Sequence, residues 1–315
     1  MPPFEELRVF AGTAHIELAD SICDYLGVTR GDSEVFKFSN DNTFVQFREN
    51  IRQRDIFLVQ PFSYPVNDKI MELLIMIDAA KRASAGRITA VVPYYAYGRT
   101  DKKDQPRVPI TGRLIADLLT TAGAERVLTM DLHAGQIQGF FNIPVDELTA
   151  LPILSRYIAS KELEDLVVVA ADIGATKRAR DLASRLDAPL AIMEKRRTGN
   201  NDQTELLNVI GDVTGKTAFI VDDEIDTGGS LIATVEAVEA RGVKSTYACC
   251  THGVLSAGAH GRIGASTLKE LVITDTLPIT DSRRHEKITV LSVAPILGEA
   301  IHRIHGGLSV GAMFE

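Results

Sequence analysis

The sequence predicts an α/β protein made of two doubly wound, parallel-sheet domains, and three observations support this. Short apolar runs alternate with amphipathic helical segments along almost the whole chain. Strands that alternate with helices form parallel sheets whose two faces are covered by helices. The alternation runs through twice, and 315 residues exceed the length of one typical domain.

The first round of alternation occupies the N-terminal half of the chain. Strands are predicted at 7–11, 56–60, 88–93 and 127–132, and helices at 17–26, 67–83 and 110–122. The helix at 67–83 places Ile70, Leu73 and Ile77 on one face, and Pro109 suits the start of the helix that follows it. These elements predict one complete domain.

The second round occupies the C-terminal half. Strands are predicted at 166–171, 190–193, 206–210, 218–221, 245–251 and 288–292, and helices at 153–159, 176–186, 231–240 and 295–304. The rhythm restarts near 146–150, which gives domains at 1–148 and 149–315. The last helix of the chain, although assigned to the second domain, is expected to be able to pack on the N-terminal domain.

Composition excludes several classes of protein. Hydrophobic residues make up 45% of the chain, but no apolar run reaches a membrane-spanning length, and the N-terminus does not resemble a signal peptide. The net charge of −8 argues against a general nucleic-acid binder. Three cysteines show neither a disulfide framework nor metal-ligand spacing, so a reducing, cytoplasmic location is expected.

The most informative stretch is 219–230, where a short apolar run ends in four acids, Asp222, Asp223, Glu224 and Asp226. A Thr-Gly-Gly-Ser turn then precedes a helical pattern. Free backbone N–H groups at the start of a helix suit a phosphate, and carboxylates suit sugar hydroxyls or Mg²⁺. The pattern predicts a phosphorylated, polyhydroxylated ligand; the alternative is a strand–turn–helix with a solvated acidic tip.

Five stretches together resemble one family, the ribose-phosphate pyrophosphokinases (phosphoribosyl pyrophosphate synthetases). They are 66–79, 89–95, 126–141, 194–197 and 219–230, and the resemblance extends over nearly the whole chain. It implies two domains of phosphoribosyltransferase type. It also implies an enzyme of nucleotide biosynthesis that transfers the pyrophosphoryl group of ATP to the C1 hydroxyl of ribose 5-phosphate, needs Mg²⁺, and forms a homo-oligomer, typically a hexamer.

The resemblance assigns the sugar-phosphate and metal sites. Asp222 and Asp223 would hold the ribose hydroxyls, and His133 and Asp172 would bind the metal, with Asp131 as a neighbour of that site. The residues implied to cradle the 5-phosphate are Asp226, Thr227, Gly228, Gly229 and Ser230. His133 is an unusual ligand for magnesium, and a hydrogen-bonding core histidine is the alternative.

The resemblance also assigns the nucleotide site and a catalytic loop. The implied ATP-binding residues are Phe38, Asn40, Asp41, Asn42, Arg99 and Thr100. The family often carries an acid at the position of Asn42 and a glutamine at that of Thr100, so the contact to adenine is expected to differ in detail. Lys195 and Arg197, on the polar stretch 193–205, would close over the phosphates, with Arg197 also contacting ribose 5-phosphate; a solvated hairpin is the alternative.

Two rival functions share part of this pattern. A phosphoribosyltransferase that consumes phosphoribosyl pyrophosphate would carry the same acidic turn, but the full N-terminal half argues against it. A catalytically silent relative that regulates the synthetase would be expected to lose or interrupt the loop that carries Lys195 and Arg197, which is uninterrupted here.

Overall fold

The computed structural model describes residues 6–197 and 205–314, and the chain forms two compact units. Unit 1 comprises Met1–Thr149, Thr276–Pro278 and Ser292–Glu315, and unit 2 comprises Ala150–Asp275 and Ile279–Leu291. The predicted second domain, 149–315, is therefore too long at its end, because residues 292–315 belong to unit 1. The reason is the anchoring of the last helix, described below.

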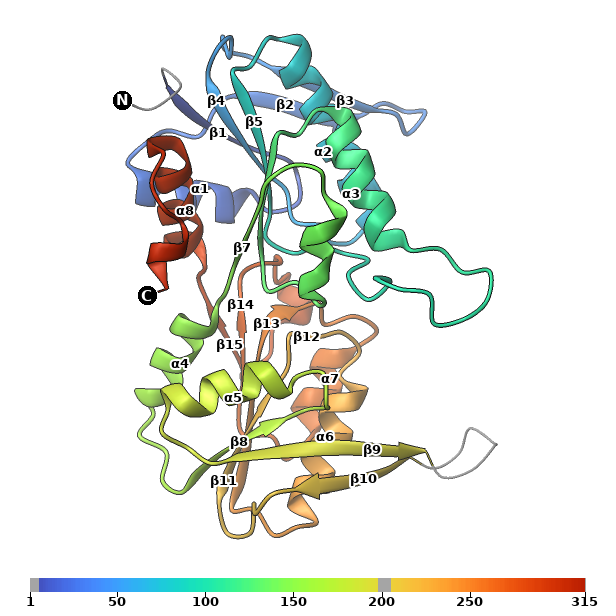
Figure 1. Ribbon diagram of the computed structural model, residues 1–315, viewed down its shortest axis with the longest axis vertical. Helices are drawn as coiled ribbons and strands as arrows, with labels where there is room; N and C mark the ends of the chain where they lie inside the picture. Colours follow the sequence, from blue (N-terminus) through green and yellow to red (C-terminus); the bar gives the residue numbers. More distant parts are fainter. Residues whose placement is uncertain (1–5, 198–204, 315) are drawn as a thin grey trace. The chain divides into compact units, whose positions relative to one another are not determined.

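Unit 1 is built on a five-stranded, all-parallel sheet (Figure 1). Its strands, in spatial order, are β1 (Leu7–Ala11), β4 (Asp55–Val59), β5 (Arg87–Val92), β6 (Arg126–Met130) and β7 (Val145–Leu148). The spatial order follows the chain order. All carboxyl ends lie at the same edge, which is where the turns after β4, β5 and β6 gather.

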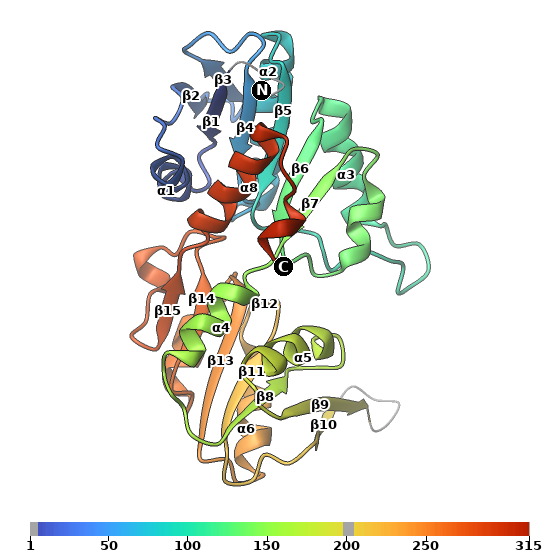
Figure 2. The ribbon, with the colours of Figure 1, turned by 60° about the vertical axis from the view of Figure 1, so that its left-hand side comes forward.

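Helices cover both faces of this sheet (Figures 1 and 2). They are α1 (Ile16–Leu26), α2 (Val66–Arg82), α3 (Thr111–Ala122) and α8 (Ala294–Gly306). Alternate strand residues such as Ile56 and Leu58 share a core cluster with Leu73 of α2 and Leu119 of α3. On the other face α1 and α8 pack side by side. A Cβ on Gly298 would lie 2.5 Å from the ring of Tyr25, so this contact requires glycine.

Buried charges anchor α8 to the start of β4 and β5. Asp55 is fully buried, and its carboxylate accepts a hydrogen bond from Arg87 Nε at 2.8 Å and lies 2.9 Å from His305 Nδ1. Arg87 Nη2 also donates to the carbonyl of Ile304 at 3.0 Å. A buried carboxylate is stable only when it is paired, so the end of the chain is fixed in unit 1.

Unit 2 contains a larger sheet whose strand order reverses. The spatial order is β10 (Glu205–Ile210), β9 (Leu190–Arg197), β8 (Leu166–Ala170), β11 (Thr217–Val221), β13 (Ser245–Gly253), β14 (Leu271–Thr274) and β15 (Ile288–Leu291). All neighbours are parallel except β9 and β10, which are antiparallel. The order reverses between β8 and β11. Ligands of open α/β sheets bind at such a switch point, beyond the carboxyl ends of the strands.

The helices of unit 2 are α4 (Leu151–Ala159), α5 (Thr176–Arg185), α6 (Gly229–Glu239) and α7 (Ala259–Ala265). The strand predicted at 190–193 is longer in the structure, because the backbone of β9 continues to Arg197 and pairs with β10. Within residues 6–197 and 205–314, no helix is both long and apolar enough to cross a membrane.

Candidate functional site

The acidic turn lies at the switch point of the unit 2 sheet. β11 is buried throughout and delivers Asp222 and Asp223 at its carboxyl end. Glu224–Ile225 then forms a short strand, β12, that pairs with β13. Helix α6 begins at Gly229, two residues earlier than predicted, with Gly228 as its N-cap at φ +79°. This left-handed backbone favours glycine and turns the chain directly from the acids into the helix.

The start of α6 suits an anion. The first N–H groups of a helix have no acceptor within the helix, and the helix dipole adds positive charge there. Thr227, Gly229 and Ser230 are exposed, and the Thr227 hydroxyl accepts a 3.4 Å bond from the amide of Gly229. The turn can therefore bind a phosphate with backbone and hydroxyl groups.

The two aspartates that precede the turn have an unusual environment. Burial, followed by a hydrogen bond with the Asp223 carboxyl and the charge of that group, raises the pKa of Asp222 to about 8. The Asp222 carboxylate also accepts a 2.9 Å hydrogen bond from the amide of Asp223. Polar groups buried this far are stabilised by hydroxyl or cationic partners, so the pair suits the hydroxyls of a sugar.

Asp172 lies at the end of the neighbouring strand. It follows β8, and its Oδ1 accepts a 2.9 Å hydrogen bond from the amide of Ala175. The charge of Asp172 contributes to the raised pKa of Asp222. Strands β8 and β11 thus bring two of the predicted site residues together, one on each side of the switch point.

In unit 1, His133 follows the end of β6. Asp131 is buried and adopts φ +40°, which is strained for a residue other than glycine. Two bonds to β7 hold this bend: the amide of Asp131 donates to the carbonyl of Leu148, and the amide of Leu132 donates to Glu147 Oε1, both at 2.9 Å. His133 is exposed, so the alternative of a core histidine is wrong.

The same bend lies against the segment that carries Arg99. A Cβ on Gly98 would be 3.3 Å from the Cβ of His133, so glycine permits this close approach. Gln136 Nε2 also donates to Asp101 Oδ2 at 2.6 Å. Within unit 1, the residue predicted to bind metal and one residue predicted to bind ATP are therefore neighbours.

The turn at 38–42 forms the tip of a separate two-stranded hairpin, β2 (Ser33–Lys37) and β3 (Thr43–Phe47). The amide of Phe38 donates to the carbonyl of Asn42 at 2.9 Å, and Asp41 adopts φ +67°. Asn40 Oδ1 accepts from the amide of Asn42 at 3.3 Å. These local bonds shape the turn at the tip of the hairpin.

Three phenylalanines form an exposed aromatic cluster on this hairpin. The ring centroids of Phe36 and Phe38 are 5.0 Å apart, and those of Phe36 and Phe44 are 4.9 Å apart. Phe38 is 49% exposed, which is unusual for a large apolar side chain and suits stacking on a base. Phe36 and Phe44 support it but were not predicted; their signal is the alternation of phenylalanine at 36 and 38.

Two contacts tie the hairpin and the Arg99 segment to the same end of α2. Lys37 Nζ lies 2.8 Å from Asp41 Oδ1 and 2.7 Å from Asp68 Oδ2. The hydroxyl of Tyr97 donates to Asn67 Oδ1 at 2.7 Å. The structure thus brings both groups of predicted ATP residues to the N-terminal end of one helix.

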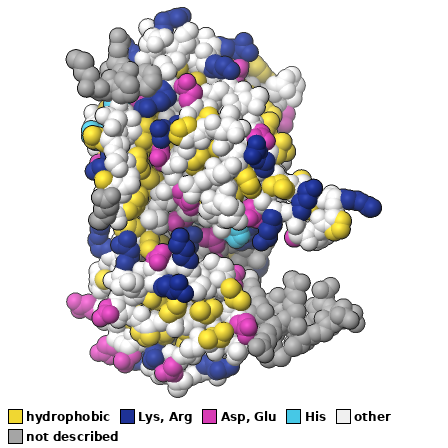
Figure 3. Space-filling model, viewed as in Figure 1, with side chains coloured by type: hydrophobic (Ala, Val, Ile, Leu, Met, Phe, Trp, Pro, Cys, Tyr) yellow, Lys and Arg dark blue, Asp and Glu magenta, His cyan; other side chains and the backbone are white. Residues whose placement is uncertain are grey.

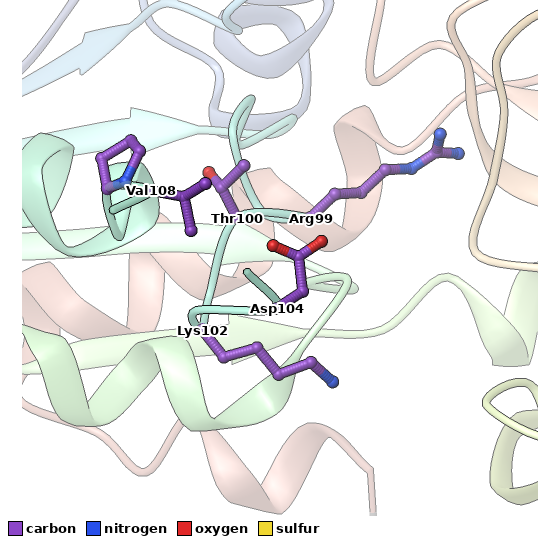
Figure 4. Close-up of a pocket in the computed structure, with 6 residues that line it drawn as sticks. Arg99, Thr100, Lys102, Asp104 and Val108 are labelled. Carbon is purple, nitrogen blue, oxygen red and sulfur yellow. The ribbon is translucent and has the colours of Figure 1, made fainter. Parts of the chain in front are cut away.

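Arg99 and Thr100 line a pocket of about 250 Å³ (Figure 4). Its other lining residues are Lys102, Asp104, Val108 and Pro109. The Thr100 hydroxyl donates to the carbonyl of Tyr97 at 2.8 Å. In Figure 4 the side chain of Arg99 extends away from Asp104 and Lys102.

Lys195 and Arg197 are placed only by their backbone. Both lie in β9, where Lys195 is opposite Leu207 and Arg197 opposite Glu205. Their side chains lie outside the described residues, so their predicted contact with phosphates stays a prediction. On the face seen in Figure 3, basic and acidic side chains are interspersed without a continuous basic patch, as expected for a net charge of −8.

Comparison with known proteins identifies the family. A model of the "N-terminal domain of ribose phosphate pyrophosphokinase" matches residues 7–123, and one of the "Phosphoribosyl synthetase-associated domain" matches residues 199–315. A ribose-phosphate pyrophosphokinase of Clostridium acetobutylicum is 54% identical, over 99% of this chain and 98% of its own length. That of Caldanaerobacter subterraneus is 52% identical over 98% of both.

A solved structure agrees with these relatives. The crystal structure of phosphoribosylpyrophosphate synthetase from Mycobacterium smegmatis superimposes with a TM-score of 0.91 at 43% identity, over 96% of this chain and 100% of that one. With relatives this similar over nearly their full length, the chain belongs to the ribose-phosphate pyrophosphokinase family.

Proposed function

We propose that this protein transfers the pyrophosphoryl group of ATP to the C1 hydroxyl of ribose 5-phosphate, giving 5-phosphoribosyl 1-pyrophosphate and AMP for nucleotide biosynthesis. The observation that carries the proposal is the acidic turn of residues 222–230, which lies at the switch point of the unit 2 sheet. The chain that carries this turn is similar over 99% of its length to a ribose-phosphate pyrophosphokinase. The C1 oxygen forms a bond to the β-phosphorus of ATP, the bond from that phosphorus to the α,β-bridging oxygen breaks, and the hydroxyl proton passes to solvent.

The sugar phosphate would be held by the acidic turn. Asp222 and Asp223 accept hydrogen bonds from the ribose hydroxyls, which relieves the cost of burying their carboxyl groups. The 5-phosphate binds at the start of α6, through the segment from Asp226 to Ser230. The carboxyl groups would thus bind the sugar hydroxyls, and the start of the helix would bind the phosphate.

The nucleotide would be held in unit 1. Phe38 stacks on the adenine ring, supported by the neighbouring phenylalanines, and Asn40, Asp41 and Asn42 offer polar contacts to it. Arg99 binds phosphate oxygens through its guanidinium, and Thr100 lies beside it. The exposed aromatic cluster and its link to the Tyr97–Thr100 segment support this assignment.

We infer that Mg²⁺ accompanies ATP, with His133 and Asp172 as its protein ligands. Among the described residues, no group of three His, Cys, Asp or Glu side chains could hold a metal alone. An exposed imidazole and a carboxylate fit an ion that is held mainly by nucleotide phosphates and water. When bound, the ion neutralises phosphate charge as the pyrophosphoryl group moves.

Lys195 and Arg197 are proposed as catalytic residues, with Arg197 also contacting ribose 5-phosphate. Phosphoryl-type transfer depends mainly on positioning and on positive charge that stabilises the transferred group. The support is the sequence, which places a Glu-Lys-Arg-Arg segment typical of the family at 194–197. Neither rival function is favoured by relatives that match the whole chain as pyrophosphokinases.

We also propose a homo-oligomer, a hexamer by resemblance, that works in the cytoplasm. The support for assembly is apolar exposure on α3, where Leu114 is 53% and Leu118 is 38% exposed. Sedimentation velocity would test it. The support for a reducing compartment is that Cys23, Cys249 and Cys250 are buried thiols that form no disulfide.

The decisive assay for the function incubates the protein with Mg-ATP, with and without ribose 5-phosphate, and separates the nucleotides. The proposal predicts AMP that forms only when the sugar phosphate is present. Formation of ADP, or turnover that does not depend on ribose 5-phosphate, would refute it.

A further inference from the structure

The acidic turn is held by a segment that follows β13, Leu255–Arg262, which we call the support segment. The amide of Leu255 donates to the carbonyl of Ile225, and the amide of Ser256 donates to that of Asp226, both at 3.0 Å. The Ser256 hydroxyl also donates to Asp226 Oδ1. The support segment therefore holds both the backbone and one carboxylate of the turn.

The support segment is itself strained. Leu255 has φ +48° and Ala257 has φ +47°, followed by Gly258 at φ +76°. Left-handed backbone is unfavourable for leucine and alanine, and it persists only where surrounding contacts impose it. Contacts with the surrounding residues must therefore hold this bend.

Arg262 of α7 holds the bend and links it to the phosphate-binding turn. Its Nη1 and Nη2 donate to the carbonyl of Ala257 at 2.9 and 2.8 Å. Its Nε donates to the carbonyl of Thr227 at 3.1 Å. One guanidinium thus fixes the strained residue of the support segment and the residue that precedes the N-cap of α6.

We propose that Arg262 is a positioning residue for ribose 5-phosphate: by holding the carbonyls of Thr227 and Ala257, it fixes the direction in which the backbone N–H groups of the turn face the 5-phosphate. This rests on the proposed function. Because Thr227 and Gly228 share a peptide bond, fixing the carbonyl of one fixes the N–H of the other. The guanidinium also places a positive charge beside the anion site.

Positioning and charge can be separated by substitution. A lysine keeps the charge but donates from a single nitrogen, so it cannot reproduce the guanidinium geometry in which Nε reaches Thr227 while Nη1 and Nη2 reach Ala257. Arg262→Lys should therefore lose the link between the two segments, and Arg262→Met should lose both link and charge. Ser256→Ala removes only the side-chain contact to Asp226. Arg284→Met is the control, because Arg284 is a largely exposed arginine of the same unit whose ion pair is with Asp281.

The test is calorimetric titration of each full-length protein with ribose 5-phosphate alone and with ATP alone. We expect the Kd for ribose 5-phosphate to rise about tenfold in Arg262→Lys and Ser256→Ala and more in Arg262→Met, as for the loss of one or two charge-assisted hydrogen bonds. The Kd for ATP should stay within about twofold of wild type, and Arg284→Met should match wild type for both ligands. Faster amide exchange in a peptide spanning 227–230 of Arg262→Lys, without ligand, would support the same cause.

Three results would overturn the proposal. Unchanged ribose 5-phosphate affinity in Arg262→Lys with weak binding in Arg262→Met would mean that only charge matters. Equal losses for ATP and ribose 5-phosphate would mean a general disturbance of the fold. Unchanged affinity in all three variants would leave Arg262 without a role. If Arg262→Met does not fold, the Kd for ribose 5-phosphate of Arg262→Lys and Ser256→Ala still tests the proposal. Failure of the wild-type protein to bind ribose 5-phosphate would instead refute the proposed function itself.

Discussion

Replacing Asp222 by asparagine should change how stability depends on pH. The carboxyl of Asp222 lies beside Asp223 in a half-buried position, and its pKa is raised from 3.8 to about 8. Burial is the main cause, followed by the hydrogen bond with the Asp223 carboxyl and by the charge of that group. Asparagine is close in size and cannot ionise, so the substitution removes the titration and leaves the packing.

The sign and size follow from proton linkage. Between pH 3.8 and about 8 the folded protein keeps a proton on Asp222 that the unfolded chain has lost, so stability falls as pH rises through this window. Each pH unit inside the window lowers the free energy of unfolding by about 1.4 kcal/mol. From pH 5 to pH 8 the contribution of Asp222 is therefore on the order of 3–4 kcal/mol, and it levels off above pH 8.

Urea denaturation of ligand-free protein at pH 5, 6, 7 and 8 would measure this. The difference in stability between Asp222→Asn and wild type should grow in favour of the variant as pH rises. Asp212→Asn is the matched control: Asp212 is exposed, and its pKa is lowered by Lys216 and the amide of Thr214, so it is ionised in both states across this range. A pH-independent difference for Asp222→Asn, or a variant that loses stability as pH rises, would show that Asp222 is ionised in the folded protein and would refute the reasoning.

Three further substitutions test other parts of the account. Lys195→Ala should lower kcat by at least about a hundredfold, because the lysine charge that stabilises the transferred pyrophosphoryl group is lost, while the calorimetric Kd for ribose 5-phosphate stays near wild type. A near-normal kcat would contradict the catalytic role of Lys195. Phe38→Ala should raise KM for ATP about five- to tenfold through lost stacking, with no change for Tyr25→Ala, an exposed aromatic of α1; equal effects of the two would argue against a base contact. His305→Ala should lower the free energy of unfolding by about 1–3 kcal/mol, since buried Asp55 loses a partner, and an unchanged midpoint in thermal denaturation would show that Arg87 alone is sufficient.

The elements whose sequence signals lie close together in the chain could be predicted from the sequence. The strand that ends at Val221 and the helix that follows Gly228 are marked by adjacent apolar, acidic and glycine residues. The end of β9 could not be predicted, because residues 194–197 are charged and only pairing with β10 makes them a strand. The assignment of α8 to unit 1 depends on Asp55 and His305, which are 250 residues apart.

The candidate site shows the same division. The acids and glycines of 222–230 predict a sugar-phosphate site, because the residues that would bind the ligand are neighbours in the sequence. The role of Arg262 is invisible in the sequence, since its partner Thr227 lies 35 residues away and accepts through its backbone. The strained backbone of Asp131 is equally hidden, because β7 imposes it through Glu147 and Leu148.

The most direct test of the central claim follows one phosphorus atom. ATP labelled with ³²P in the β-phosphate is incubated with the protein, Mg²⁺ and ribose 5-phosphate, and the products are separated. Transfer of a pyrophosphoryl group predicts that the label leaves the nucleotide and appears in the sugar product, with unlabelled AMP formed in equal amount. Label that remains in ADP would mean transfer of a single phosphoryl group and would contradict the account.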